Sequence, residues 1–172
     1  LGITTVSCCL SLYYAITRPS SHCMLISYSM DSASAIFDKL KQMYDDLPNA
    51  MKPKEIANNR SALKFSNGSK ITVCTMGSKE LARGSSLTFV HVSEVAFCKQ
   101  DTVMKQLLAI EQALLPDGKI ILESTANGMN EFFNLWTKAE NRESLYKPFF
   151  FSWIDDKLMF VEEYKEFADR YR

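Results

Sequence analysis

The chain has 172 residues, which is enough for one ordinary domain that covers both faces of a sheet. Lys+Arg and Asp+Glu both number 20, so no global field draws the protein to nucleic acid or to a membrane, and any DNA contact must come from local patches. The five cysteines form no CxxC pair and only two histidines could join them, which argues against zinc, and the apolar stretch 6–16 is far too short to span a bilayer.

The first part of the chain predicts a helix, a strand and a second helix. Residues 4–16 are apolar nearly all round, which is typical of a buried helix, and residues 22–28 form a continuous apolar run of strand length. Residues 29–47 place apolar side chains at helical spacing, with Asp31 as the expected N-cap, and a proline follows this run.

The rest of the chain predicts a hairpin and then a further alternation of strands and helices. Residues 61–65 and 70–76 alternate as hairpin strands do, and Asn67-Gly68 between them supplies the positive backbone angles that a tight turn needs. Strands are expected at 87–92, 119–124 and 148–153, and helices at 101–115, 130–140 and 162–172. Buried strands that alternate with helices indicate an α/β fold with a mostly parallel sheet covered on both faces.

The leading segment, Leu1-Gly2-Ile3-Thr4-Thr5, has the form of the second half of a phosphate loop, GxxxxGKS/T, with Ile3 at the usual lysine position. In such a loop the backbone N–H groups at a helix start hold phosphate, and the hydroxyl after the lysine position holds Mg²⁺. A glycine followed by two threonines also fits plain helix capping.

A second candidate is Glu94, which an apolar strand delivers at its carboxyl end. Parallel sheets place their ligand crevice at that end, and a glutamate there can orient and deprotonate the water that attacks a γ-phosphate. Ser93 occupies the position of the usual strand-end aspartate; it can hydrogen-bond a Mg²⁺-bound water but brings no charge. Taken alone, Glu94 fits better as the cap of the next segment.

A third candidate lies in the sequence ESTANG, residues 123–128, again after an apolar strand and before a helix. The hydroxyls of Ser124 and Thr125 could sense the terminal phosphate and pass its loss to neighbouring elements, with Asn127 beside them. A strand-to-helix turn that uses Ser, Thr, Asn and Gly as local hydrogen bonders explains the same residues.

A fourth candidate is Arg83, on a polar loop between two glycines that leads into the strand ending at Glu94. An arginine beside a phosphate site can stabilise charge on the transferred group, in its own or a neighbouring subunit. Loop arginines are more often simply solvated, so the order of all four signals along the chain decides the interpretation.

Taken in that order, the sequence resembles the large terminase family of tailed bacteriophages over nearly its whole length. The matching stretches are LGITT, the helix that ends in DDLP, LKFSNGSKI, ELARGSSLTFVHVSEVAF and ESTANGMNEFFNLW. The resemblance implies a P-loop NTPase-like fold of the ASCE type, with a mostly parallel sheet, helices on both faces and a β-hairpin.

The resemblance also implies roles for individual residues. Gly2, Thr4 and Thr5 match the end of the phosphate loop, with Thr4 on Mg²⁺ and Ser93 reaching the metal through water. Glu94 matches the catalytic carboxylate, and Arg83 matches the proposed arginine finger. The coupling motif that links hydrolysis to movement matches Ser124, Thr125 and Asn127. Members of this kind can carry the phosphate-loop lysine earlier in the loop, which here falls before Leu1.

The implied function is an ATPase motor that hydrolyses ATP with Mg²⁺ to move double-stranded DNA into a procapsid. The implied partners are a portal protein, a small terminase subunit and further copies of the chain in a ring, with no membrane, in the host cytoplasm and transiently docked on the procapsid. Because Leu1 opens directly into an apolar run, we expect residues 1–172 to be an ATPase domain truncated at its N-terminus, without the downstream nuclease domain.

Two other functions stay open at the level of sequence. One is a different strand-stacked P-loop ATPase, such as a helicase or recombinase, which would need further motifs that the sequence lacks. The other is a decayed prophage remnant that acts only as a binding domain, which Ile3 and the uncharged Ser93 keep open. Candidate DNA contacts rest on charge alone, and a solvated surface explains them as well: Lys52, Lys54, Lys64 and Lys70.

Overall fold

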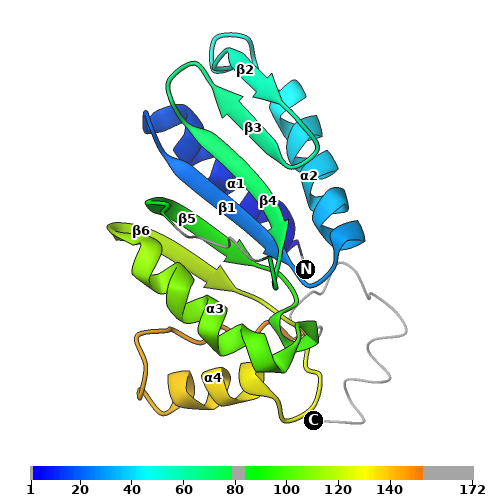
Figure 1. The fold of residues 1–172 in the computed structure, drawn as a ribbon, viewed down its shortest axis with the longest axis vertical. Helices are drawn as coiled ribbons and strands as arrows, with labels where there is room; N and C mark the ends of the chain where they lie inside the picture. The colour runs from blue at the N-terminus through cyan, green and yellow to red at the C-terminus, as the bar shows by residue number, and fades with distance from the viewer. Residues whose placement is uncertain (1, 79–83, 153–172) are drawn as a thin grey trace. The chain divides into compact units, whose positions relative to one another are not determined.

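The computed structural model describes residues 2–78 and 84–152 (Figure 1). The contacts within the chain divide it into one compact unit, Gly2–Leu135, and a second unit from Trp136 onwards. The first unit holds the sheet and its helices. The described helices are α1 (Ile3–Thr17), α2 (Met30–Asp45), α3 (Gln100–Ala113) and α4 (Glu131–Glu140), with the short 3-10 helix η1 (Val95–Phe97). None of them is long and apolar enough to cross a membrane.

The strands of the first unit form one sheet in the order β2-β3-β4-β1-β5-β6. Their bounds are β1 (His22–Ser27), β2 (Glu55–Asn58), β3 (Ala62–Phe65), β4 (Lys70–Thr75), β5 (Leu87–Val92) and β6 (Leu114–Leu122). Strand β1 pairs in parallel with β4 and β5, and β5 pairs in parallel with β6, whereas β3 is antiparallel to both β2 and β4. The carboxyl ends of β1, β4, β5 and β6 therefore meet at one rim of the sheet.

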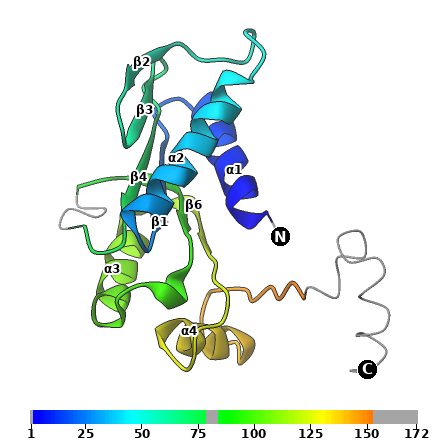
Figure 2. The ribbon, with the colours of Figure 1, turned by 90° about the vertical axis from the view of Figure 1, so that its right-hand side faces the viewer.

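Helices cover both faces of this sheet, with α1 and α2 on one side and α3 on the other (Figure 2). The first core packs side chains of α1 and α2 against Leu25 of β1 and Phe65 of β3, both fully buried. The second core packs α3 through Leu107 and Ile110 against Val90 of β5. The alternation of side chains along β1 and β5 supplies both cores, which is why these two central strands are buried throughout.

The predicted α/β class, with a mostly parallel sheet, helices on both faces and a hairpin, is confirmed. Strand β5 has the predicted bounds, and α1, β1, α2, α3 and α4 differ from prediction by one or two residues at their ends. The predicted strand at 119–124 begins earlier, at Leu114. The Pro-Asp-Gly segment before the predicted start therefore lies inside the strand. The pairing of this strand with β5 has an irregularity between Leu87 and Phe89 of β5.

Several local predictions were wrong. The N-cap of α2 is Ser29, whose side chain accepts from the backbone N–H of Ser32, because the helix begins one residue before the expected cap, Asp31. In the hairpin turn the positive φ belongs to Gly68 and not to Asn67. Residues 148–152 form no strand, β2 was not predicted, and the helix expected at 162–172 lies outside the described residues.

Candidate nucleotide site

A cleft of about 440 Å³ opens at the rim where the carboxyl ends of β1, β5 and β6 meet the first turn of α1. This volume falls within the usual range of small-molecule sites. The cleft is lined by the start of α1, the residue after β1, helix α2, and the loops after β5 and β6. Its lining residues include Thr4, Tyr28, Lys39, Ser93, Glu94 and Thr125. Two residues singled out from distant parts of the sequence, Thr4 and Glu94, thus face the same cleft.

The start of α1 has the backbone geometry of a sharp turn into a helix. Gly2 is the N-cap with φ 74° and ψ 10°, a left-handed conformation that favours glycine, and no side chain caps it. The hydroxyl of Thr4 donates to Oε1 of Glu123 at 2.8 Å, and that of Thr5 accepts from Nζ of Lys39 at 3.2 Å. The helix start therefore offers free N–H groups and carries a cation beside it.

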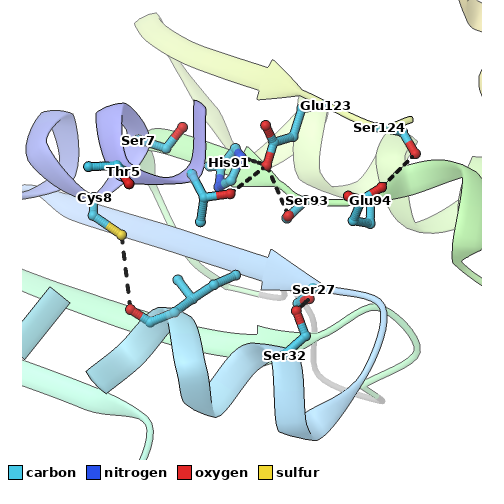
Figure 3. Close-up of polar contacts among 12 residues, drawn as sticks. Thr5, Ser7, Cys8, Ser27, Ser32, His91, Ser93, Glu94, Glu123 and Ser124 are labelled. Atoms are coloured by element: carbon cyan, nitrogen blue, oxygen red, sulfur yellow. Dashed lines mark hydrogen bonds and ion pairs between the residues drawn. The ribbon is translucent and has the colours of Figure 1, made fainter. Parts of the chain in front are cut away.

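Glu94 has a left-handed backbone, with φ 54° and ψ 50°, which is uncommon for a residue with a side chain. It lies at the N-cap position of η1, but its side chain makes no capping hydrogen bond. Its Oε2 instead accepts from Oγ of Ser124 at 3.2 Å (Figure 3). The same oxygen also accepts from the backbone N–H and the hydroxyl of Thr125, at 3.2 and 3.4 Å. The capping interpretation thus does not account for this carboxylate, which is directed at the end of β6.

The loop after β6 is tied to the loop after β5 through one buried residue, Ala96. Oγ of Ser124 accepts from the backbone N–H of Ala96 at 3.1 Å. The side-chain amides of Asn127 and Asn130 both donate to the carbonyl oxygen of Ala96, at 3.1 and 3.0 Å. Ser124, Thr125 and Asn127 therefore hold Glu94 and η1 in a fixed relation to β6.

Glu123, which sequence reasoning did not assign, is the centre of a second polar cluster. Its Oε1 accepts from Thr4 and, at 3.0 Å, from Oγ of Ser93, and lies 3.2 Å from Nε2 of His91 (Figure 3). The side chain of His91 is fully buried. The His91 contact lacks the alignment of a hydrogen bond. Burial acts to raise the pKa of Glu123, but His91 and then the hydroxyls of Thr4 and Ser93 outweigh it, so the pKa is lowered and the carboxylate stays ionised.

Sequence reasoning also missed His91 and Lys39. A charged group at the very end of an apolar strand was a signal available for Glu123, because it has nearly the same placement as Glu94. No pattern marks Lys39, which is one of two lysines on α2 and reaches the cleft only through the packing of α2 beside α1. Lys52, Lys54, Lys64 and Lys70 do not line the cleft, and Arg83 lies outside the described residues.

The side-chain atoms at this rim that could bind a metal ion are hydroxyl and carboxylate oxygens. Such hard ligands suit Mg²⁺, which binds proteins through one or two carboxylates and otherwise through water and substrate phosphates. Among the residues that the structure describes, no group of three or more His, Cys, Asp and Glu side chains could hold a metal by itself. The cleft therefore fits a cation that arrives with a phosphate ligand better than a permanent metal centre.

No family model matches this sequence. The fold is that of the ATPase domain of phage large terminases. The ATPase domain of the Thermus phage P74-26 large terminase is 19% identical over 78% of this chain and 59% of that one, with a TM-score of 0.56. The large terminase of a thermophilic bacteriophage, solved in complex with ADP, is 16% identical over 99% and 42%, with a TM-score of 0.66.

The HK97 bacteriophage large terminase has the same fold, with 13% identity over 83% of this chain and 31% of that one and a TM-score of 0.66. This chain thus spans less than two thirds of the length of each of these structures. The fold expected from the sequence resemblance is confirmed by these structures.

Proposed function

We propose that this chain is the ATP-hydrolysing motor domain of a viral DNA-packaging terminase. The observation that carries the proposal is that Thr4 and Glu94 line one cleft at the carboxyl rim of a parallel sheet. This is the edge at which α/β proteins bind nucleotides, and one of the similarly folded large terminases, that of a thermophilic bacteriophage, has been solved in complex with ADP.

The start of α1 would bind the phosphates of ATP. Its free N–H groups and the positive end of the helix dipole attract anions, and Lys39 adds a full positive charge next to Thr5. Thr4 would hold Mg²⁺ through its hydroxyl oxygen, with Ser93 beside it. When bound, Mg²⁺ neutralises charge on the phosphate oxygens.

Glu94 would orient and deprotonate the attacking water. Its left-handed backbone turns the residue at the point where β5 ends, and its carboxylate lines the cleft. The hydrogen bonds from Ser124 and Thr125 fix one carboxylate oxygen, Oε2. A fixed carboxylate at the phosphate site is the arrangement that general base catalysis requires.

The same hydrogen bonds supply a route for coupling. Ser124 contacts both Glu94 and the backbone of Ala96, so a shift of Glu94 on loss of the γ-phosphate would be felt by the loop after β6. We propose that this motion drives double-stranded DNA, gripped through its backbone without sequence readout, in a ring of subunits. Its partners would be a portal protein and a small terminase subunit, in the host cytoplasm at the procapsid.

The test is the Glu94→Gln variant, measured for ADP·Mg²⁺ binding and for ATP turnover. The proposal predicts retained binding and a turnover at least about 100-fold lower, because the general base is lost. Glu55→Gln, the same chemical change on edge strand β2, is the matched control and should leave both unchanged. Unchanged turnover in Glu94→Gln would remove Glu94 from the chemistry, and a wild-type protein that binds no ADP·Mg²⁺ would contradict the nucleotide site itself.

A further inference from the structure

Glu123 brings a second carboxylate to the rim, beside the uncharged Ser93. The residue that follows β5 and precedes Glu94 is Ser93, which carries no charge toward a cation held by Thr4. The neighbouring parallel strand, β6, ends directly before Glu123. Because β5 and β6 run side by side in parallel, this carboxylate reaches the same rim from one strand further along the sheet.

A single oxygen of Glu123 holds both hydroxyls of the candidate metal site. Oε1 accepts from Thr4 at 2.8 Å and from Ser93 at 3.0 Å, while Thr4 and Ser93, unlike Glu123, line the cleft. A hydroxyl has one proton and two lone pairs. When that proton points at Glu123, the lone pairs of each hydroxyl are left to face away from the carboxylate, toward a ligand in the cleft.

The side chain of Glu123 is itself held in place by His91. Its side chain is 21% exposed, and the fully buried ring of His91, on β5, lies against the same oxygen at 3.2 Å. Partial burial strengthens the effect of such a charge on its neighbours. A carboxylate clamped in this way has little freedom to leave the two hydroxyls.

From this geometry we propose, resting on the proposed function, that Glu123 is the positioning residue of the divalent cation site. It orients the hydroxyls of Thr4 and Ser93 toward the cation and supplies the negative charge that Ser93 does not. It acts through these two side chains and not by contact with the nucleotide.

The test measures metal binding without turnover. Mn²⁺ replaces Mg²⁺, and its binding to the protein in the presence of ADP is followed by electron paramagnetic resonance, for wild type, Glu123→Gln, Ser93→Asp/Glu123→Gln and the control Glu55→Gln. ADP binding in EDTA is measured alongside, to report the nucleotide site without metal. The double variant moves the carboxylate back to the end of β5.

We expect Glu123→Gln to bind Mn²⁺ at least about tenfold more weakly, the usual cost of losing a residue that orients metal ligands, with ADP binding in EDTA unchanged. We expect Ser93→Asp/Glu123→Gln to recover most of the lost affinity and Glu55→Gln to match wild type. A purely structural Glu123 would lower thermal stability in both variants and leave the double variant as weak as the single one.

Wild-type Mn²⁺ affinity in Glu123→Gln, or no recovery in the double variant, would overturn the role of Glu123 while leaving the nucleotide site intact. A wild-type protein that binds neither ADP nor ADP·Mn²⁺ would instead contradict the proposed function, and the role of Glu123 would fall with it.

Discussion

The hydroxyl of Thr4 donates a hydrogen bond of 2.8 Å to Oε1 of Glu123, although 119 positions separate the two residues. The bond joins the first turn of α1 to the end of β6, with the end of β5 contributing Ser93 to the same oxygen. Three elements of the rim thus meet at one carboxylate. Substitution of either residue of this bond should therefore alter cation binding at the candidate site.

Replacing Thr4 by Val, which keeps the shape of the side chain and removes its hydroxyl, should abolish the contribution of Mg²⁺ to nucleotide binding. We expect the affinity for ADP in EDTA to stay within about twofold of wild type, while the gain in affinity on adding Mg²⁺ is lost. Isothermal titration calorimetry with and without Mg²⁺ measures both quantities. Thr4→Ser keeps the hydroxyl and serves as the control, and a full Mg²⁺ effect in Thr4→Val would exclude Thr4 as a metal ligand.

Replacing Ser124 by Ala should destabilise the fold and disturb Glu94 together. The backbone N–H of buried Ala96 loses its hydrogen-bond acceptor, which costs about 1–3 kcal/mol, and Oε2 of Glu94 loses one donor. Urea unfolding measures the first effect and ATP turnover the second. Ser124→Thr, which retains a hydroxyl, should recover most of the stability; a Ser124→Ala protein as stable as wild type would show that the Ala96 bond contributes little.

The parts of the fold that were predictable from sequence are those in which one pattern dominates. Strand β5 is buried throughout because both of its faces are covered, and α2 has a clear apolar face, so both were predicted almost to the residue. Strand β2, by contrast, is a four-residue edge strand with half of its residues exposed, and its pairing with β3 is what makes it a strand. The apolar run at 148–152 shows the opposite error, because hydrophobicity alone does not supply a pairing partner.

The residues of the candidate site also divide into those that the sequence could indicate and those that it could not. Glu94 and Ser124 could be picked out because polar residues that follow apolar strands stand out in a sequence. The roles of Glu123 and Lys39 depend on which strands are neighbours and on how α2 packs beside α1. Those are tertiary relationships between segments far apart in the chain, and no local spacing encodes them.

Gly68, in the turn between β3 and β4, should resist substitution by Ala. Its φ of +83° is costly for a residue with a side chain, and an added Cβ would lie 3.0 Å from Oγ of Ser20. We expect Gly68→Ala to lower the free energy of unfolding by about 1–2 kcal/mol, measured by urea denaturation. Ser66→Ala, at an exposed position of the same turn, should change it by less than about 0.5 kcal/mol. Equal stabilities for the two variants would show that the turn tolerates another backbone conformation at residue 68.

The stability of the fold should fall with acidification because of His22 on β1. Burial, helped by the positive charge of Lys70, lowers the pKa of His22 from its ordinary 6.5 to about 4, and its Nε2 lies 3.0 Å from Oγ1 of Thr72. Between these two values the unfolded chain binds a proton that the folded protein does not. The contribution of His22 to the free energy of unfolding is therefore fully present above about pH 6.5 and is lost as the pH falls toward 4. The loss is on the order of 3 kcal/mol, at about 1.4 kcal/mol per pKa unit.

The comparison that isolates His22 is with His22→Gln, whose amide can still hydrogen-bond Thr72 but takes up no proton in this range. The remaining titratable groups are common to both proteins, so the quantity of interest is the difference in unfolding free energy between wild type and variant, measured by urea denaturation from about pH 7.5 to 4. That difference should shift in favour of the variant as the pH falls below about 6.5, since only the wild type then loses the contribution of a buried neutral imidazole. A difference that stays constant over this range would mean that His22 takes up its proton in the folded protein as readily as in the unfolded chain.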